Sequence, residues 1–396
     1  MMTSRERLLA ALERKVPDRL PVTTHHVQES FLRRRLEGLS VQAFFDRFGL
    51  DPILWLDAHK PDIRNGAYFY PGRSASGPGA GPGLDEPRIL LSDSWQLRKT
   101  HLPDHRSVRY EFLTPRRSLS LVMRTDENTA WVSERLIKEK SDIDLIAAYA
   151  PAPLCDAEAV NREAELFAGR GLVRGTVPGF DVAGQPGCWQ DAAVLYGIEN
   201  LILAAYDDPD WLRAFLGILL ERKKPYVRSL HGAKFDLVEL GGGDASSTVI
   251  SPRIFEEFVA PFDAELIRLA HEAGQRIVYH TCGGMMPLLE IIAALGVDAM
   301  ETFTPASMGG DADLGEAKRR VGDRVCLIGG FDQFHHFLGC APEDTRRAVR
   351  RCFEAAGPGG GYILAPSDHF FDADPELLEA YADEAGKCVY GRSAGP

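Results

Sequence analysis

Two residues with the chemistry of zinc ligands, His280 and Cys282, stand two positions apart in the segment 276–282 (RIVYHTC). In an extended strand, residues two apart point to the same side, so the imidazole and the thiol would be aimed at one point. A catalytic zinc needs about three protein ligands and one open position. We therefore predict a zinc site around this pair. Because H-x-C also occurs by chance, the alternative is a hydrogen-bonded histidine beside a small buried cysteine.

The candidates for the remaining metal ligands are Glu301, Asp368 and His369. Glu301 ends the strand predicted after His280, and the other two follow the last predicted strand. Barrel enzymes collect their functional side chains at the carboxyl ends of the strands, so residues from different strands can meet there. A site completed by carboxylates would be harder and richer in oxygen than a site of thiolates.

Polar residues also end the other predicted strands, and we predict that they contact or act on a substrate. Glu239 and Asp244 flank the turn LGGGD, whose glycines let a ligand approach the backbone, and they are candidates for acid and base. The alternative for them is a tight turn with a solvated carboxylate. Asp332 is the third candidate catalytic residue. The candidates for substrate binding are His25, His26, Asp181 and Gln333.

Eight short apolar segments must position these residues, and the later ones alternate with helical stretches. This alternation is typical of parallel strands joined by crossover helices. The predicted strands are 20–24, 51–56, 172–179, 235–242, 276–282, 298–303, 325–330 and 362–367. Eight such units predict an α/β fold of the (β/α)8 TIM-barrel type. No G-x-G-x-x-G motif with its acidic partner and no Walker A motif is present, which disfavours a nucleotide-binding sheet.

The whole chain, residues 1–396, is predicted to form one domain. The apolar spacing of SRERLLAALERK predicts an N-terminal helical extension, which Pro17 ends. Residues 72–83 (GRSASGPGAGPG) are predicted to form a flexible loop, because glycine and proline break regular structure. Strand-like composition on both sides of Thr114 and Pro115 predicts a β-hairpin insertion over residues 108–125.

The composition narrows the classes of function. A chain of 396 residues with 45% hydrophobic residues can bury a sizeable core. Its net charge of −12 disfavours nucleic-acid binding, so a small molecule or a protein is the expected partner. The sequence has no apolar run of roughly 18 residues and no signal-peptide core, so we expect no membrane span and a cytoplasmic location. Seven widely spread cysteines predict reduced thiols and no disulfide framework.

Several segments together resemble the uroporphyrinogen decarboxylase superfamily, which includes the porphyrinogen decarboxylase and the zinc-dependent corrinoid and thiol methyltransferases. The similar segments are SRERLLAALERKVPDRLPV, ISPRIFEEFVAPFDAELI, HTCGGMMPLLEIIAALGVDAMETF, LIGGFDQ and GGGYILAPSD. They span nearly the whole chain. The superfamily has a barrel fold, which agrees with the eight predicted strands.

The resemblance implies a choice between two branches. The decarboxylases carry an R-Q-A-G-R-Y motif after the first strand that grips the substrate's carboxylates, whereas this sequence reads THHVQESFLRRR there. The methyltransferases carry H-x-C after the fifth strand, matched by His280 and Cys282, and a further cysteine in a segment like A-P-G-C-G. Here that segment reads A-P-S-D-H, so Asp368 or His369 replaces the cysteine. The more distant cobalamin-independent methionine synthases have a glutamate ligand at a position resembling Glu301.

The pattern is closest to the methyltransferase branch. The first hypothesis is therefore a metal-dependent methyltransferase that moves a methyl group between a small substrate, a methyl ether or a thiol, and a corrinoid. Zinc would lower the pKa of a substrate thiol or polarise an oxygen. A separate protein would supply the corrinoid, because no segment of this chain resembles a cobalamin-binding domain. The second hypothesis is a decarboxylase or lyase of a small or tetrapyrrole carboxylate. The third is a barrel that binds a ligand without catalysis.

Overall fold

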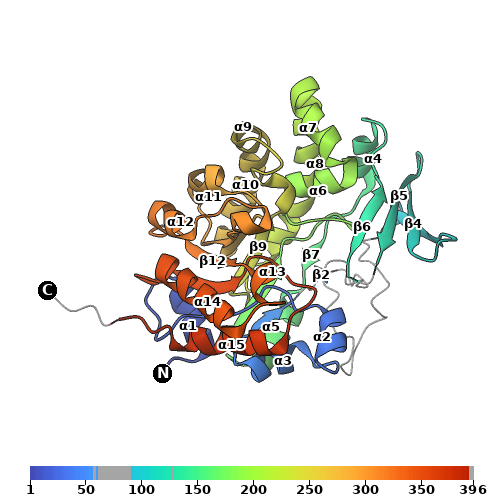
Figure 1. Ribbon diagram of the computed structural model, residues 1–396. Helices are drawn as coiled ribbons and strands as arrows, with labels where there is room; N and C mark the ends of the chain where they lie inside the picture. The colour runs from blue at the N-terminus through green and yellow to red at the C-terminus, as the bar shows by residue number, and fades with distance from the viewer. Residues whose placement is uncertain (57–58, 61–90, 127, 392–396) are drawn as a thin grey trace.

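The computed structural model describes residues 1–56, 59–60, 91–126 and 128–391. Its centre is a curled parallel sheet of seven strands in the order β1-β8-β9-β10-β11-β12-β13 (Figure 1). The strands of this sheet are β1 (Ile53–Trp55), β8 (Leu172–Thr176), β9 (Leu237–Gly241), β10 (Ile277–His280), β11 (Ala299–Thr302), β12 (Cys326–Phe331) and β13 (Tyr362–Pro366). Seven of the eight predicted strands are thereby confirmed, in a barrel-like α/β arrangement.

The first predicted strand, residues 20–24, is not a strand, so this part of the prediction is wrong. Val22 forms only an isolated parallel bridge with Leu364 of β13, and its carbonyl accepts a hydrogen bond of 2.7 Å from the amide of Asp51. Pro21 and Pro52 lack the amide protons that a continuous ladder requires. The segment therefore lies between β13 and the start of β1 with few hydrogen bonds to either.

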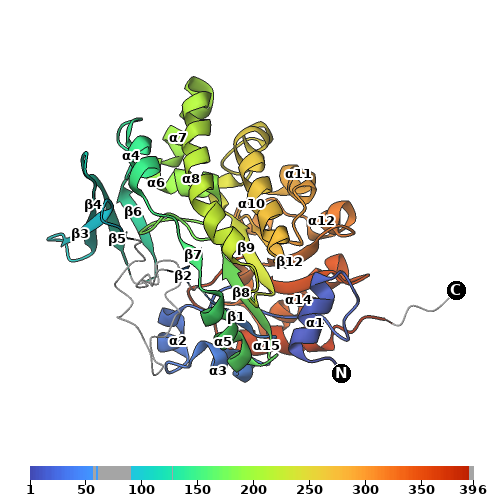
Figure 2. The same ribbon diagram turned by 180° about the vertical axis from the view of Figure 1, so that it is seen from behind.

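Helices cover the outside of the sheet and one end of its interior (Figure 2). The helices of the first half are α1 (Ser4–Leu12), α2 (Glu29–Arg35), α3 (Val41–Phe48), α4 (Asp142–Tyr149), α5 (Ala157–Phe167), α6 (Cys188–Tyr196), α7 (Ile198–Asp207) and α8 (Pro209–Ser229). Those of the second half are α9 (Pro252–Ile254), α10 (Ala260–Glu272), α11 (Leu289–Ala294), α12 (Leu314–Val321), α13 (Gln333–His336), α14 (Pro342–Ala356) and α15 (Pro375–Lys387). A π-helical turn, Phe255–Val259, links α9 to α10.

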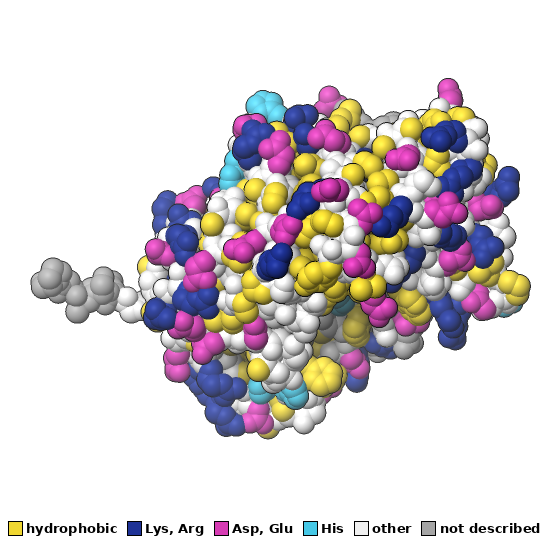
Figure 3. Space-filling model, turned by 90° about the horizontal axis from the view of Figure 1, so that it is seen from above, with side chains coloured by type: hydrophobic (Ala, Val, Ile, Leu, Met, Phe, Trp, Pro, Cys, Tyr) yellow, Lys and Arg dark blue, Asp and Glu magenta, His cyan; other side chains and the backbone are white. Residues whose placement is uncertain are grey.

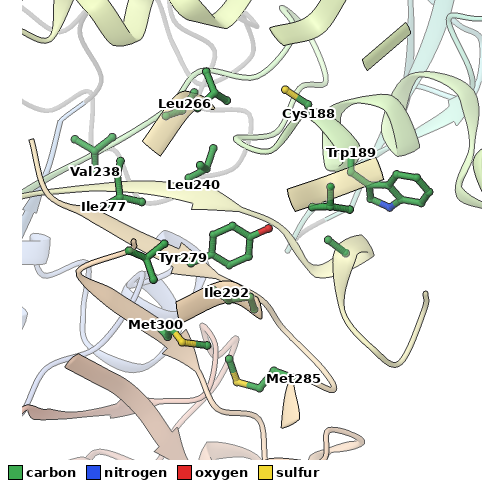
Figure 4. Close-up of a cluster of buried hydrophobic side chains, with 14 of the residues drawn as sticks. Cys188, Trp189, Val238, Leu240, Leu266, Ile277, Tyr279, Met285, Ile292 and Met300 are labelled. Atoms are coloured by element: carbon green, nitrogen blue, oxygen red, sulfur yellow. The ribbon is translucent and has the colours of Figure 1, made fainter. Parts of the chain in front are cut away.

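The outward side chains of the strands form the main core with these helices. Val238, Leu240, Ile277, Tyr279 and Met300 point away from the barrel interior and gather against residues of α6, α10 and α11 (Figure 4). The predicted N-terminal extension is α1, whose Leu8 and Leu12 pack in a separate apolar cluster with the inward side chains. The amino-terminal end of the barrel is thus filled with apolar side chains.

The predicted hairpin insertion is part of a larger unit. Residues 108–125 fall in the middle pair of a four-stranded antiparallel sheet, which lies beside α4 and α6 (Figures 1 and 2). Its strands are β3 (Gln96–His101), β4 (Ser107–Leu113), β5 (Leu119–Thr125) and β6 (Ala130–Glu134). A second small sheet pairs β2 (His59–Lys60) with β7 (Leu154–Cys155). The predicted loop 72–83 lies outside the described residues.

Charge on the molecular surface is mixed in sign. On the face seen in Figure 3, lysine and arginine side chains alternate with acidic and hydrophobic ones, and the described residues of this face form no continuous basic area. None of the described helices has the length and apolarity to cross a membrane.

Candidate metal centre

The side chains that point into the barrel form two layers. The lower layer is apolar and includes Leu172, Leu237, Val278 and Ala299. Two positions further along the same strands, the upper layer consists of Arg174, Glu239, His280 and Glu301. All four are at most 9% exposed. The side-chain alternation of a strand thus places four charged or polar groups together at the carboxyl ends.

Cys282 and Asp368 converge on His280 of this layer, and the three form a group of possible metal ligands. One ligand atom from each lies within 4.8 Å of those of the other two. The Nε2 atom of His280 is 2.8 Å from the sulfur of Cys282, which confirms that the two residues point the same way. Asp368 arrives from the end of β13, where the Nδ1 atom of His369 is 2.8 Å from its carboxylate.

The opposite nitrogen of His280 faces a carboxylate. Its Nδ1 atom lies 2.9 Å from Oε1 of Glu301, and β10 and β11 are paired so that the two residues are neighbours. Arg174 donates to both carboxylate oxygens of Glu301 and, at 2.7 Å, to Glu239. The guanidinium also lies over the ring of Trp55, 4.2 Å from its centroid. Glu301 therefore lies on the Nδ1 side of His280, away from Cys282.

His25 completes a second group of possible ligands with Glu239, His280 and Glu301. Its Nε2 atom lies 3.3 Å from Glu301 and 3.4 Å from Glu239. His25 and Arg174 also line a small cavity inside the barrel, between the segment 23–25 and residues of β1, β11, β12 and β13. Burial would lower the pKa of His25, but the two glutamates outweigh it and raise the pKa to about 9.

The charge states of the three converging residues follow from their surroundings. Burial, and next the Asp368 carboxylate, raise the pKa of the Cys282 thiol to about 11. Burial would lower the pKa of His280, but Cys282, Glu239 and Glu301 raise it well above its usual value. Burial would raise the pKa of Asp368, yet the neighbouring histidines lower it. The three groups therefore influence one another's pKa values.

A family model described as uroporphyrinogen decarboxylase (URO-D) matches residues 132–387, which is more than half of the chain. The chain belongs to the uroporphyrinogen decarboxylase family. Curated uroporphyrinogen decarboxylases from Thioalkalivibrio sulfidiphilus and Neisseria meningitidis are both 31% identical to it, over 189 and 187 residues. These matches cover 46% and 45% of this chain and 50% and 49% of the relatives. The chain spans about half the length of the curated relatives it matches.

A solved structure supports the same barrel over almost the whole chain. It is described as a methyltransferase from Methanosarcina mazei and has a TM-score of 0.61 at 15% sequence identity. The match covers 98% of this chain and 99% of that one. At this identity the likeness shows the fold alone.

Two predicted catalytic residues have partners outside the upper layer of this URO-D-family barrel. Asp244 is bonded to Gln190 of α6 through its carboxylate, at 2.8 Å, and through its backbone amide, at 2.6 Å. Asp332 caps α13, where its oxygens accept from the hydroxyl of Ser307 at 2.5 Å and face Nδ1 of His335 at 2.8 Å. Of the three candidates, only Glu239 lies beside the possible metal ligands.

The predicted substrate-binding residues also divide. His25 lines the pocket, and His26 packs against it with ring centroids 4.2 Å apart. Gln333 is buried and accepts a hydrogen bond of 3.0 Å from the amide of Ser367. Asp181 accepts 2.5 Å and 3.2 Å bonds from Arg222 and Trp95. His25 thus lines the pocket and His26 packs behind it, whereas Gln333 and Asp181 bond to residues of the surrounding loops.

Arg174, Thr23 and Thr24 also lie at the site, although the sequence did not single them out. The signal for Arg174 was present, because a charged residue inside the apolar run LVRGTV is unusual in a buried parallel strand. The two threonines are 1% exposed and line the pocket, and no described residue is a hydrogen-bond partner of either hydroxyl. Nothing in their sequence context distinguishes them from ordinary strand residues.

Proposed function

We propose that the protein is a zinc-dependent methyltransferase, which moves a methyl group between a small methyl ether or thiol and a corrinoid carried by a partner protein. The observation that carries the proposal is the convergence of Nε2 of His280, Sγ of Cys282 and the carboxylate of Asp368 within 4.8 Å. Nitrogen, sulfur and oxygen donors of this kind suit zinc, and three protein ligands leave one position for a substrate. The donor set therefore fits the metal.

His280, Cys282 and Asp368 would hold the zinc. When bound, zinc supplies a Lewis acid that stabilises a substrate thiolate or polarises an ether oxygen. Glu301 keeps the His280 ring in place by accepting from Nδ1, so that Nε2 faces the site. His25, Thr23 and Thr24 line a cavity of about 10 Å³ below, which has room for a water molecule and not for the substrate.

A second candidate is decarboxylation of a small carboxylate, because the curated relatives in the family are decarboxylases. The positively charged groups beside the pocket are Arg174 and His25, and Glu301 lines it as well. Arg174 is already bonded to two glutamates, and the three arginines of the segment THHVQESFLRRR bond to Glu29, Phe371 and Asp372 of the barrel's outer parts. A substrate with many carboxylates would therefore find few available cations. Turnover of uroporphyrinogen would overturn this preference.

The first test is the metal content of protein purified without added metal, measured by plasma mass spectrometry. We expect about one zinc per chain, lost in His280→Ala and in Cys282→Ala. His335→Ala and Cys340→Ala are matched controls, because these residues bond only to Asp332 and Thr345 in the described structure. The controls should keep their zinc. A wild-type protein that binds no metal even when zinc is supplied would contradict the proposal.

The second test follows methyl transfer directly. Zinc-loaded protein is mixed with a panel of methyl ethers and methyl thioethers and with free corrinoid that added titanium(III) citrate holds in the Co(I) state. Co(I) takes the methyl cation to become methyl-Co(III), the alkoxide or thiolate leaves and takes a proton from water, and the corrinoid absorption is recorded. We expect a change of absorption with at least one class of substrate and none in Cys282→Ala. If the protein binds zinc but transfers no methyl group to the corrinoid from any of the substrates, the metal site is supported and the methyltransferase assignment is refuted.

A further inference from the structure

His280 belongs to two groups of possible metal ligands, and its two ring nitrogens serve different groups. Nε2 faces Cys282 at 2.8 Å, in the group with Asp368. Nδ1 faces Glu301 at 2.9 Å, in the group with His25 and Glu239. We call these the outer group and the inner group. A metal must therefore take one side of the ring or the other.

The number and burial of the ligands alone would favour the inner group. It offers two imidazoles and two carboxylates, all four of them buried, whereas the outer group is only partly buried. Both sets contain common ligands of divalent metals. Something other than ligand type must decide between the two sides of His280.

The deciding feature is a cation that the protein itself places in the inner group. The guanidinium of Arg174 is bonded to Glu239 and to both oxygens of Glu301, and its side chain is 2% exposed. Arginine keeps its charge in proteins. Its position over the Trp55 ring, 4.2 Å from the centroid, holds it in place. A dication bound to the same carboxylates would meet a fixed like charge in a site shielded from water.

We infer that Arg174 occupies the inner group as a built-in cation and so directs the metal to the Nε2 side of His280. Glu301 is then a positioning residue and not a metal ligand, because Arg174 and His280 already use its two oxygens. Without Arg174, the two buried carboxylates would lose one of their counter-charges. The inference rests on the proposed metal site and names the residue that selects it.

The test asks whether removing the cation opens the inner group. Cys282→Ala disables the outer group and should lose its zinc. Adding Arg174→Met to Cys282→Ala should restore about one zinc per chain, because the inner ligands are then free of their cation. Adding Arg174→Lys instead keeps a positive charge and should restore none. Cobalt substituted for zinc gives a second readout, because thiolate-to-cobalt absorption is expected in the wild type and not in the restored double variant.

Arg222 provides a matched control for the loss of a buried arginine. It is 7% exposed, pairs with Asp181 and lies over the Phe180 ring, 4.6 Å from the centroid, so that its surroundings resemble those of Arg174. Adding Arg222→Met to Cys282→Ala should restore no zinc. If Arg222→Met/Cys282→Ala binds zinc again, a general loosening of the structure admits the metal. The removal of the Arg174 cation is then not the cause, and the inference is overturned.

A second variant keeps the inference falsifiable if the double variant does not fold. Glu239→Gln changes a ligand of the inner group only, so the zinc content of the otherwise wild-type protein should stay the same. Loss of zinc in Glu239→Gln would overturn the inference, as would a folded Arg174→Met/Cys282→Ala protein that stays free of zinc. Zinc that persists in Cys282→Ala alone would refute the proposed outer site itself.

Discussion

Two clusters of buried charge lie on opposite sides of the parallel sheet and differ in how completely their polar atoms are paired. Outside the sheet, Lys223 of α8 donates to the carbonyls of Pro178 and Gln185 at 2.8 Å and pairs with Asp191 at 2.7 Å. The other oxygen of Asp191 accepts from the amides of Phe180 and Gln185. Every donor of the ammonium therefore has a partner.

Inside the barrel, the second cluster is less completely paired, and several of its atoms could bind a metal or another ligand. Nε2 of His280, the sulfur of Cys282 and the Asp368 carboxylate face one another, and the hydroxyls of Thr23 and Thr24 have no partner among the described residues. Burying such groups costs stability unless something binds them. A buried cluster whose polar atoms all have hydrogen-bond partners stabilises the fold. A buried cluster in which possible ligand atoms converge and some polar atoms lack partners indicates a binding site.

The largest effect on stability is expected at the pair of Lys223 and Asp191. Lys223→Met leaves Asp191 buried without its counter-charge, so the free energy of unfolding should fall by about 3–5 kcal/mol. Urea denaturation measures this loss. Lys224→Met, which removes the next lysine and its pair with the exposed Glu221, should cost far less. If a folded Lys223→Met protein loses its zinc, the Lys223 cluster also supports metal binding, and the two clusters do not differ in role.

The second-largest effect is expected on zinc affinity when His280 loses the carboxylate that orients its ring. Glu301→Gln replaces the carboxylate that accepts from Nδ1, and zinc affinity should fall by about 10- to 100-fold, as for other partners of metal-bound histidines. Competition with a chromogenic chelator measures the affinity. Glu384→Gln changes another buried glutamate, paired with Arg350 at 2.7 Å, and should leave zinc binding unchanged. An equal fall of zinc affinity in Glu301→Gln and Glu384→Gln would show that Glu301 does not position His280.

Asp263 of α10, which lies outside the sheet and interacts with Lys223, makes the stability of the protein sensitive to pH. Burial, only partly offset by the hydroxyl of Tyr279 and by Lys223, raises its pKa to about 6. The folded protein then binds this proton more tightly than the unfolded chain, whose aspartates have a pKa of about 4. The stability from Asp263 is therefore present below pH 4 and lost as the pH rises through 6.

Asp263→Asn removes this pH dependence. Relative to the wild type, the variant should gain of order 1–2 kcal/mol in unfolding free energy between pH 4 and pH 7. Denaturation at both pH values measures the difference. An identical change of stability with pH in the two proteins would show that Asp263 does not titrate in this range.

The smallest effect is expected at Asp332. Because its side chain caps α13, Asp332→Ala should cost about 0.5–2 kcal/mol of stability and leave both zinc content and the rate of methyl transfer unchanged. Asp313→Ala, which removes the cap of α12, is the matched control. A fall in turnover of about 100-fold with normal stability would restore the catalytic role that the sequence suggested.

Local patterns explain why most of the fold could be predicted. The apolar runs of β8 to β13 and the helices between them follow from hydrophobic periodicity. The two-residue spacing placed the side chains of His280, the last residue of β10, and of Cys282 on the same side of the chain. Residues 20–24 failed as a strand because Pro21 and Pro52 leave the ladder incomplete. The hairpin was predicted too small because β3 and β6 have mixed composition and gain their order from pairing with β4 and β5.

The sequence by itself determined the barrel-forming strands, the family and the pair of His280 and Cys282. Only the tertiary structure decided which residues face that pair. The register of β10 against β11 sets Glu301 beside Nδ1, and the curl of the sheet brings Arg174 of β8 and Asp368 after β13 to opposite sides of the ring. These contacts join residues far apart in the chain, so no local propensity or spacing can specify them.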